Sequence, residues 1–178
     1  MKLREYKTTD CGQMLLDRLL REEEMNEILY RKTTKDDMEI LMKLRLEMLR
    51  EVNDLSGEYE YDEKFISESR RYFESGEQTT VIALDGQTPV GCASLSYIWI
   101  MPTFSHPTGN RAHLMNVYTR ADHRRSGISK KMVEILIEEA KENGVTEISL
   151  DATEIGRPLY EVLGFQASDS CMVMELNM

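Results

Sequence analysis

The segment from Arg124 to Lys130, which reads Arg-Arg-Ser-Gly-Ile-Ser-Lys, has the residue types of an anion-binding site. It lies between a predicted strand and a long predicted helix. Unpaired N–H groups at the start of a helix point outward, and the helix dipole favours negative charge there. Gly127 allows a ligand to approach the backbone closely, and the basic side chains add positive charge. A pyrophosphate would fit this arrangement. The alternative is an ordinary helix start whose basic side chains are solvated and bind no ligand.

Two other kinds of nucleotide-binding site are not predicted. The chain has neither a Gly-x-x-x-x-Gly-Lys-[Ser/Thr] loop nor a Gly-x-Gly-x-x-Gly fingerprint, which disfavours an NTPase and a dinucleotide-binding protein. The formal net charge is −10. Because binding to phosphates along nucleic acid requires a basic surface, this charge disfavours nucleic acid as a partner.

Cysteine usage and hydrophobicity favour a cytoplasmic protein with no metal site and no membrane contact. Cys11, Cys92 and Cys171 are far apart and lack metal-ligand spacing, which is typical of reduced thiols in a cytoplasm. No run approaches the roughly 18 consecutive apolar residues of a membrane span. Residues 1–10 are charged and lack the apolar region of a secretory signal.

Hydrophobic periodicity and turn residues predict the elements that position the anion-binding segment. In chain order they are strand 28–32, helix 38–52, helix 62–75, strand 79–84, strand 89–100, strand 112–119, helix 129–143, strand 147–152, helix 157–163 and strand 171–176. The crossover through helix 129–143 indicates that the strands on either side of it run parallel. The sequence therefore predicts a mixed α/β fold in one domain from residue 28 to residue 178.

Residues 1–27 precede this domain and are predicted to form a helical extension. Cys11–Leu29 carries apolar residues at helical intervals, interrupted by the charged run at 21–24. A helix of this kind is marginal alone and needs a surface to pack on. We therefore expect it to dock on its own domain or on a second copy, which favours a homodimer.

The segment Leu114–Met132 resembles the first signature of the GNAT superfamily of N-acetyltransferases, which is a strand, then [Gln/Arg]-x-x-Gly-x-[Gly/Ala], then a helix. Arg124 takes the first position of that signature and Gly127 its first glycine, whereas Ser129 stands where the family prefers Gly or Ala. Leu159–Phe165, which reads Leu-Tyr-Glu-Val-Leu-Gly-Phe, is similar to the second signature, Leu-Tyr-x-x-x-Gly-Phe. The two motifs occur in the order of the family, with one predicted strand between them.

The resemblance implies a fold and a co-substrate. The fold is the acyl-CoA N-acyltransferase fold, a mixed, splayed central sheet flanked by helices, which opens between strands 112–119 and 147–152. Acetyl-CoA would lie in this wedge, with its pyrophosphate on the backbone of residues 125–130 and its thioester near the N–H groups of Val117 and Thr119. The implied acetyl-CoA-binding residues are Val117, Tyr118, Thr119, Arg124, Arg125, Ser126, Gly127, Ile128, Ser129, Lys130 and Thr153, the last at a position where many members have Asn.

The resemblance also implies two catalytic residues. Tyr160 matches the signature tyrosine that often acts as general acid toward the departing thiolate, and a phenol is neutral at working pH. His113 stands where some members carry a general-base Glu, and an imidazole could take the proton of an ammonium directly or through water. Both residues also fit structural roles, as a core tyrosine and a strand-edge histidine. Period-two alternation predicts that His113, Met115, Val117 and Thr119 share one face.

Residues 51–63 are rich in Asp and Glu, with Tyr59 and Tyr61 among them. In the family this region borders the acceptor amine, and carboxylates and aromatic faces attract cations, although a solvated acidic loop is an alternative. The sequence thus predicts an enzyme that moves an acetyl group from acetyl-CoA to a primary amine of a small molecule, with a cationic acceptor favoured. A non-catalytic acyl-CoA-binding regulatory module of the same fold and a protein or peptide N-acetyltransferase are alternatives.

Overall fold

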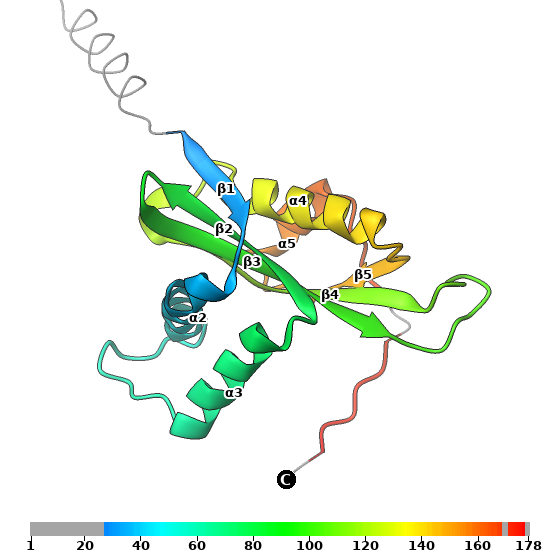
Figure 1. The fold of residues 1–178 in the computed structure, drawn as a ribbon, viewed down its shortest axis with the longest axis horizontal. Coiled ribbons are helices and arrows are strands. Elements are labelled where there is room, and N and C mark those ends of the chain that lie inside the picture. Colours follow the sequence, from blue (N-terminus) through cyan, green and yellow to red (C-terminus); the bar gives the residue numbers. More distant parts are fainter. Residues whose placement is uncertain (1–26, 169–170, 177–178) are drawn as a thin grey trace, which may run out of the picture.

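The computed structural model describes residues 27–168 and 171–176, and a five-stranded sheet forms the centre of this part of the chain (Figure 1). The strands lie in chain order: β1 (Ile28–Lys32), β2 (Gln78–Asp85), β3 (Thr88–Trp99), β4 (Asn110–Thr119) and β5 (Glu147–Ser149). Neighbours from β1 to β4 are antiparallel, and β5 runs parallel to β4. The predicted mixed sheet is therefore confirmed, including its parallel pair.

Helices cover both faces of the sheet (Figure 1). On one face lie α2 (Met38–Val52) and α3 (Glu63–Ser75), and on the other lie α4 (Ile128–Glu142) and α5 (Arg157–Val162). Short helical turns, η1 (Lys35–Asp37) and η2 (Ala121–His123), precede α2 and the loop before α4. The carboxylate of Asp62 caps α3 by accepting two backbone N–H groups, and Gly76, with a φ of 75°, ends that helix.

Two apolar layers hold the helices on the sheet. The larger layer packs α4 against β2, β3 and β4, and its fully buried members include Leu95, Met132 and Leu136. The smaller layer packs α2 against the opposite face through side chains such as Leu44 and Ile82. Burial of each such side chain contributes roughly 1.5–3 kcal/mol to the free energy of folding. The two layers therefore hold the helices firmly against the sheet.

A β-bulge in β4 changes which of its side chains share a face. Met115 pairs with Ser94 of β3 and Tyr118 pairs with Cys92, so β4 has two residues between these pairs where β3 has one. Asn116 is the first of the two and takes a positive φ of 56°. An extra residue in one strand shifts every later side chain to the other face.

The bulge makes the predicted alternation along this strand wrong. Leu114 lies in the α4 layer, so its neighbours His113 and Met115 face α2 and α3. Beyond the bulge, Val117 packs against the α4 layer, and Thr119 bonds to the first turn of α4. His113 and Met115 therefore lie on the opposite face from Val117 and Thr119.

The C-terminal part of the sheet is shorter than the sequence predicts. β5 ends at Ser149 rather than at residue 152, and residues 171–176 are not a strand. These residues are mostly apolar, as in many strands, but a strand forms only where a neighbour supplies hydrogen bonds, and here the segment is exposed. The prediction of a strand over 171–176 is therefore wrong.

The predicted N-terminal helical extension and its docking fall almost entirely outside the described residues. At the end of the expected helix, Ile28 and Leu29 belong to β1 instead. Within the described ranges, no helix combines the length and the apolar character that crossing a bilayer requires.

Candidate active site

The strands β4 and β5 pair briefly and then separate. Their ladder ends at the pair His113–Ser149, whereas β4 continues to Thr119. Beyond His113, the backbone groups on this edge of β4 have no β5 partner. Such an edge can bind another extended chain or ligand, and the bulge at Asn116 lies within it.

Contacts from distant parts of the chain hold the bulge. The Asn116 side-chain amide donates to Cys92 Sγ at 3.4 Å, and Arg45 Nη1 donates to Asn116 Oδ1 at 3.4 Å. The Cys92 thiol donates to the Asn116 carbonyl at 3.5 Å, and burial raises the pKa of this thiol to about 12, so it keeps its proton. Gly91 gives the bulge room, since a Cβ there would lie 2.7 Å from the Tyr118 carbonyl oxygen. Because Asn accepts a positive φ more readily than most residues, its presence here fits the bulge.

The loop before α4 presents a row of free backbone N–H groups. Arg125 and Gly127 have positive φ values of 64° and 82°, which turn the chain tightly into the helix. Within the described part of the chain, no acceptor bonds to the N–H groups of residues 125–130. The first that is bonded is that of Lys131, which donates to the Gly127 carbonyl at 3.0 Å. Successive free N–H groups at a helix N-terminus form an anion-binding surface.

Side-chain contacts fix this loop against β4. The hydroxyl groups of Thr119 and Ser129 are hydrogen-bonded at 2.7 Å, and Ile128 is buried in the α4 layer. The Ser126 hydroxyl donates to the His123 carbonyl. Ser129, which departs from the small residue that the family prefers, thus has a structural role as a tie between the helix and the strand.

The basic side chains of the loop are placed differently from one another. Arg124 folds back, so that its Nε donates to the Thr119 carbonyl at 2.9 Å and its guanidinium pairs with Glu51 of α2. Lys130 pairs with Glu134 at 3.1 Å, and Arg125 is exposed. Arg124 therefore holds the loop to α2, whereas the side chain of Arg125 extends into solvent.

Sequence reasoning missed the acidic residues of α2 that support this loop. Glu47 pairs with Arg120 at 2.8 Å, one helical turn from the pair between Glu51 and Arg124. Glu47 and Glu51 are four positions apart, and so are Arg120 and Arg124. This equal spacing is the sequence signal that could have predicted the two ion pairs.

Tyr160 lies on α5, on the α4 side of the sheet. Its ring packs edge-on against Phe165, with the centroids 5.9 Å apart, and against the α4 layer. Burial raises the pKa of Tyr160, so the phenol keeps its proton at neutral pH. Its hydroxyl has no hydrogen-bond partner among the described residues and is free to donate to a ligand.

His113 lies where β4 and β5 separate, on the opposite face of the sheet from Tyr160. Its Nδ1 is 2.9 Å from Ser149 Oγ, and its Nε2 is 3.7 Å from the Asp151 carboxylate. The side chain is 25% exposed, so a ligand at the gap could reach it. The structure does not join the two predicted catalytic residues by a contact and places them on two sides of the sheet.

The remaining two predicted cofactor-binding residues have local partners. Thr153 starts the turn into α5, since its hydroxyl accepts the Gly156 N–H at 3.1 Å and its carbonyl accepts the Arg157 N–H at 2.9 Å. The side chain of Tyr118 faces α2, and its hydroxyl donates to Glu51 at 3.5 Å. Only the backbone of Tyr118 therefore belongs to the free strand edge.

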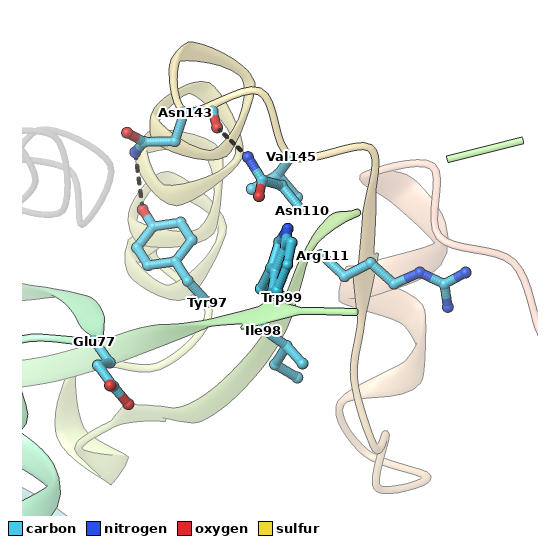
Figure 2. A pocket seen from close by; sticks show the side chains of 8 residues that line it. All are labelled: Glu77, Tyr97, Ile98, Trp99, Asn110, Arg111, Asn143 and Val145. Atoms are coloured by element: carbon cyan, nitrogen blue, oxygen red, sulfur yellow. Dashed lines mark hydrogen bonds between the residues drawn. The ribbon is translucent and has the colours of Figure 1, made fainter. Parts of the chain in front are cut away.

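A hollow of about 460 Å³ lies at the other end of α4 (Figure 2). It is lined by Glu77, Tyr97, Ile98, Trp99, Asn110, Arg111, Asn143 and Val145. The 15 residues of α4 give a helix about 22 Å long, so this hollow is remote from the free N–H groups of the loop. In the described ranges, no three His, Cys, Asp or Glu side chains gather as metal ligands would. The split between β4 and β5 is therefore the candidate active site.

Together, the fold and the site define an α/β protein whose sheet divides beside a helix N-terminus with free N–H groups. Residues 46–165 match the family described as the acetyltransferase (GNAT) family. The chain belongs to this family, which confirms the resemblance drawn from the two sequence motifs.

Individual relatives support the assignment. A glucosamine 6-phosphate N-acetyltransferase of Trypanosoma brucei brucei is 35% identical over 89 residues, which are 49% of this chain and 57% of that protein. The uncharacterized N-acetyltransferase YsnE of Bacillus subtilis is 29% identical over 89 residues, 47% of this chain and 53% of that protein. The chain thus spans about half the length of these curated relatives. A predicted acetyltransferase from Clostridium acetobutylicum, solved with acetyl-CoA, matches with a TM-score of 0.75 and 28% identity over 84% of this chain and 96% of that one.

Proposed function

We propose that this protein is an enzyme that transfers the acetyl group of acetyl-CoA to a primary amine of a small molecule. The observation that carries the proposal is the row of free N–H groups at residues 125–130, next to the free edge of β4. A pyrophosphate needs hydrogen-bond donors and positive potential, and an extended pantetheine arm needs a strand edge. The solved relative from Clostridium acetobutylicum, which contains acetyl-CoA, supports this use of the fold.

In this proposal the backbone of residues 125–130 binds the pyrophosphate, and Arg125 and Lys130 add positive charge. The free edge of β4 receives the pantetheine arm, and the N–H groups of Val117 and Thr119 polarise the thioester carbonyl. Arg124 acts indirectly by holding the loop on Glu51. The turn at Thr153 borders the same gap from the side of β5.

The site would support direct attack by the amine. The amine nitrogen forms a bond to the thioester carbonyl carbon, and the carbon–sulfur bond breaks. The acceptor ammonium first gives one proton to His113, directly or through water, and the nitrogen gives a second proton to solvent as the amide forms, while Tyr160 donates a proton to the departing thiolate. Exchange with solvent then restores both residues, so protons balance over one turnover.

The acidic segment between α2 and α3 would attract the acceptor, because a primary amine is a cation before it loses its proton. Glu58, Glu60 and Glu63 are exposed there. Glu51 and Asp62 are less available, since the first pairs with Arg124 and the second caps α3. The name of the Trypanosoma brucei relative, an amino-sugar-phosphate acetyltransferase, is consistent with a small-molecule acceptor.

The free hydroxyl of Tyr160 favours an enzyme over a module that only binds acyl-CoA. A purely structural tyrosine whose hydroxyl makes no hydrogen bond in the protein could be replaced by phenylalanine at little cost. A proton donor that acts on a ligand has a use for this group.

The proposal is tested by calorimetry with CoA and acetyl-CoA, followed by an assay of thiol release. The assay compares polyamines, amino sugars, aminoglycosides, amino acids and peptide N-termini as acceptors. We expect acetyl-CoA to bind and thiol release to depend on a small-molecule amine. Binding without amine-dependent release would support the regulatory module, and release with peptides alone would support a peptide acetyltransferase.

A further inference from the structure

Arg45 of α2 carries a half-buried positive charge that the chemistry above does not use. Its Nε donates to Ser69 Oγ at 3.5 Å and its Nη1 to Asn116 Oδ1 at 3.4 Å, both long for hydrogen bonds. Its guanidinium carbon lies 5.7 Å from the centroid of the Phe65 ring. Because a guanidinium has five N–H donors, these contacts leave most of its donor capacity unused.

No carboxylate balances this charge. Among residues 27–168 and 171–176, no Asp or Glu lies within ion-pair distance of Arg45, whereas Arg120 pairs with Glu47 at 2.8 Å and Arg70 pairs with Glu39 at 2.7 Å. Arg50, on the same helix as Arg45, also has no carboxylate partner among these residues and donates to the Tyr59 carbonyl instead. A charge removed from water without a partner is unfavourable. A negative group from outside the chain would therefore find a half-buried guanidinium without a carboxylate partner here.

The ionisable neighbours of Arg45 are uncharged at neutral pH. Burial raises the pKa of Tyr72, and it raises that of Cys92 to about 12. The Tyr61 hydroxyl donates to the Leu46 carbonyl at 2.9 Å. Burial also lowers the pKa of Arg45, but a guanidinium stays charged in proteins. None of these neighbours offsets the charge.

The position of Arg45 places this charge on the acceptor side of the split sheet. The loop at residues 125–130 begins α4, so acetyl-CoA would approach from that face and leave the face of α2 and α3 to the acceptor. Arg45 contacts Asn116 at the bulge, in the free part of β4. The hydroxyl groups of Tyr72 and Ser96, 2.6 Å apart, extend the same polar surface toward Met115.

We propose that Arg45 binds an anionic group of the acceptor, so that the acceptor is a primary amine that also carries a carboxylate or a phosphate. The planar guanidinium can bind two oxygens of either group at once. The amine at the other end of the molecule would then lie toward the gap and the acidic segment between α2 and α3. The amine part of this statement rests on the proposed acetyl transfer, whereas the anion site does not.

The first test compares acceptors that differ only in the anionic group. The pairs are ethanolamine and O-phosphoethanolamine, tyramine and tyrosine, and glucosamine and glucosamine 6-phosphate. We expect kcat/KM to be about tenfold or more higher for the anionic member of at least one pair, mainly through KM, as one charged hydrogen-bonded contact provides. The phosphate and carboxylate pairs distinguish the two anions.

Three variants assign the effect to Arg45. Arg45→Gln should remove the preference without changing acetyl-CoA affinity, and Arg45→Lys should keep part of it. Arg50→Gln is the matched control, because Arg50 lies on the same helix and has the same kind of ring contact, 5.6 Å from the Tyr61 centroid. It should leave the preference unchanged.

A second measurement does not depend on transfer. Inorganic phosphate or acetate, added with saturating CoA so that the loop at 125–130 is filled, should raise the melting temperature of the wild type and not of Arg45→Gln. If the anions stabilise the wild type in this way but no acceptor is acetylated, the anion site would stand and only the proposed acetyl transfer would be contradicted. A shift that persists in Arg45→Gln, or no anion effect on either stability or acceptor choice in the wild type, overturns the proposal. If Arg45→Gln does not fold, Arg45→Lys and the wild-type measurements decide.

Discussion

Thr119 and Ser129 are joined by a hydrogen bond of 2.7 Å between their hydroxyl groups, which fixes the end of β4 to the first turn of α4. Thr119 is almost completely buried, whereas Ser129 is partly exposed, so this bond is partly shielded from water. The free strand edge and the free N–H groups of the loop are therefore held at a set spacing. A ligand that spans both finds them already positioned, which lowers the cost of binding it.

The two hydroxyl groups of this pair should be energetically coupled, so that the costs of removing them do not add. We expect Ser129→Ala to lower the free energy of unfolding by about 1–2 kcal/mol, because it leaves the buried Thr119 hydroxyl unsatisfied, and Thr119→Val to lower it by less, because the partly exposed Ser129 hydroxyl can bind water. The double variant should cost less than the sum of the two. Urea unfolding of the four proteins measures the coupling, and strictly additive costs would show that the bond does not hold the two elements together.

Gly127→Asp should abolish the rise in melting temperature that acetyl-CoA causes, because it adds a negative charge beside the phosphates. Gly76→Asp is the matched control, since Gly76 has a similar φ of 75° and, like Gly127, open space around its Cα. Both changes should cost about 1 kcal/mol of stability through the left-handed backbone. Differential scanning fluorimetry with and without acetyl-CoA distinguishes the two effects. Backbone strain lowers the melting temperature of both variants, whereas the added charge removes the acetyl-CoA-induced rise only in Gly127→Asp. A full shift in Gly127→Asp would remove the pyrophosphate assignment.

Tyr160→Phe should lower kcat by roughly 10- to 1000-fold, the range for loss of one acid catalyst, with little change in acetyl-CoA affinity. The pKa of Tyr160 is raised by burial, so the acid form persists to higher pH than the ordinary value of about 10. The wild type should therefore keep its alkaline activity up to that pH. Tyr97→Phe, at the remote hollow, is the control. Unchanged kcat in Tyr160→Phe, measured by thiol release, would reduce Tyr160 to a packing role.

His123 should stabilise the fold in a pH-dependent way. Its pKa is raised by hydrogen bonds to Asp122 first and to Asp85, so the folded state favours the charged imidazole. This contribution is fully present below the unfolded pKa of about 6.5 and is lost as pH rises through the higher folded pKa. We expect the wild type to exceed His123→Gln in free energy of unfolding by up to about 1 kcal/mol at low pH, a limit set by solvent screening. Urea unfolding across the pH range measures this, and a constant difference would contradict it.

The elements around the anion-binding loop could be predicted from the sequence because their signals are local. Gly127 lies between a strand pattern and a helix pattern, and in the structure it directly precedes α4 with a positive φ of 82°. Tyr160 falls on the predicted short helix for the same reason. Neither position requires a distant contact to be known.

The bulge in β4 could not be predicted because its causes are distant in the sequence. Asn116 is held by Cys92, 24 positions away, and by Arg45, 71 positions away. Nothing in the alternating sequence of 112–119 marks the extra residue. The prediction of a strand over 171–176 failed for the opposite reason, since its apolar residues are typical of a strand but none of the described strands pairs with it.

Because of the bulge, side chains of β4 that alternation would place on one face lie on opposite faces of the sheet before and after Asn116. Substitutions at His113 or Met115 change the surface under α2 and α3, whereas substitutions at Val117 or Thr119 change the surface under α4. In a strand without the bulge, all four side chains would share one surface, and any change for one ligand would disturb the other. Under the proposed function, the chain could therefore diverge toward new acceptors, or be redesigned for them, through His113 and Met115 while Val117 and Thr119 keep the surface for the acyl donor unchanged.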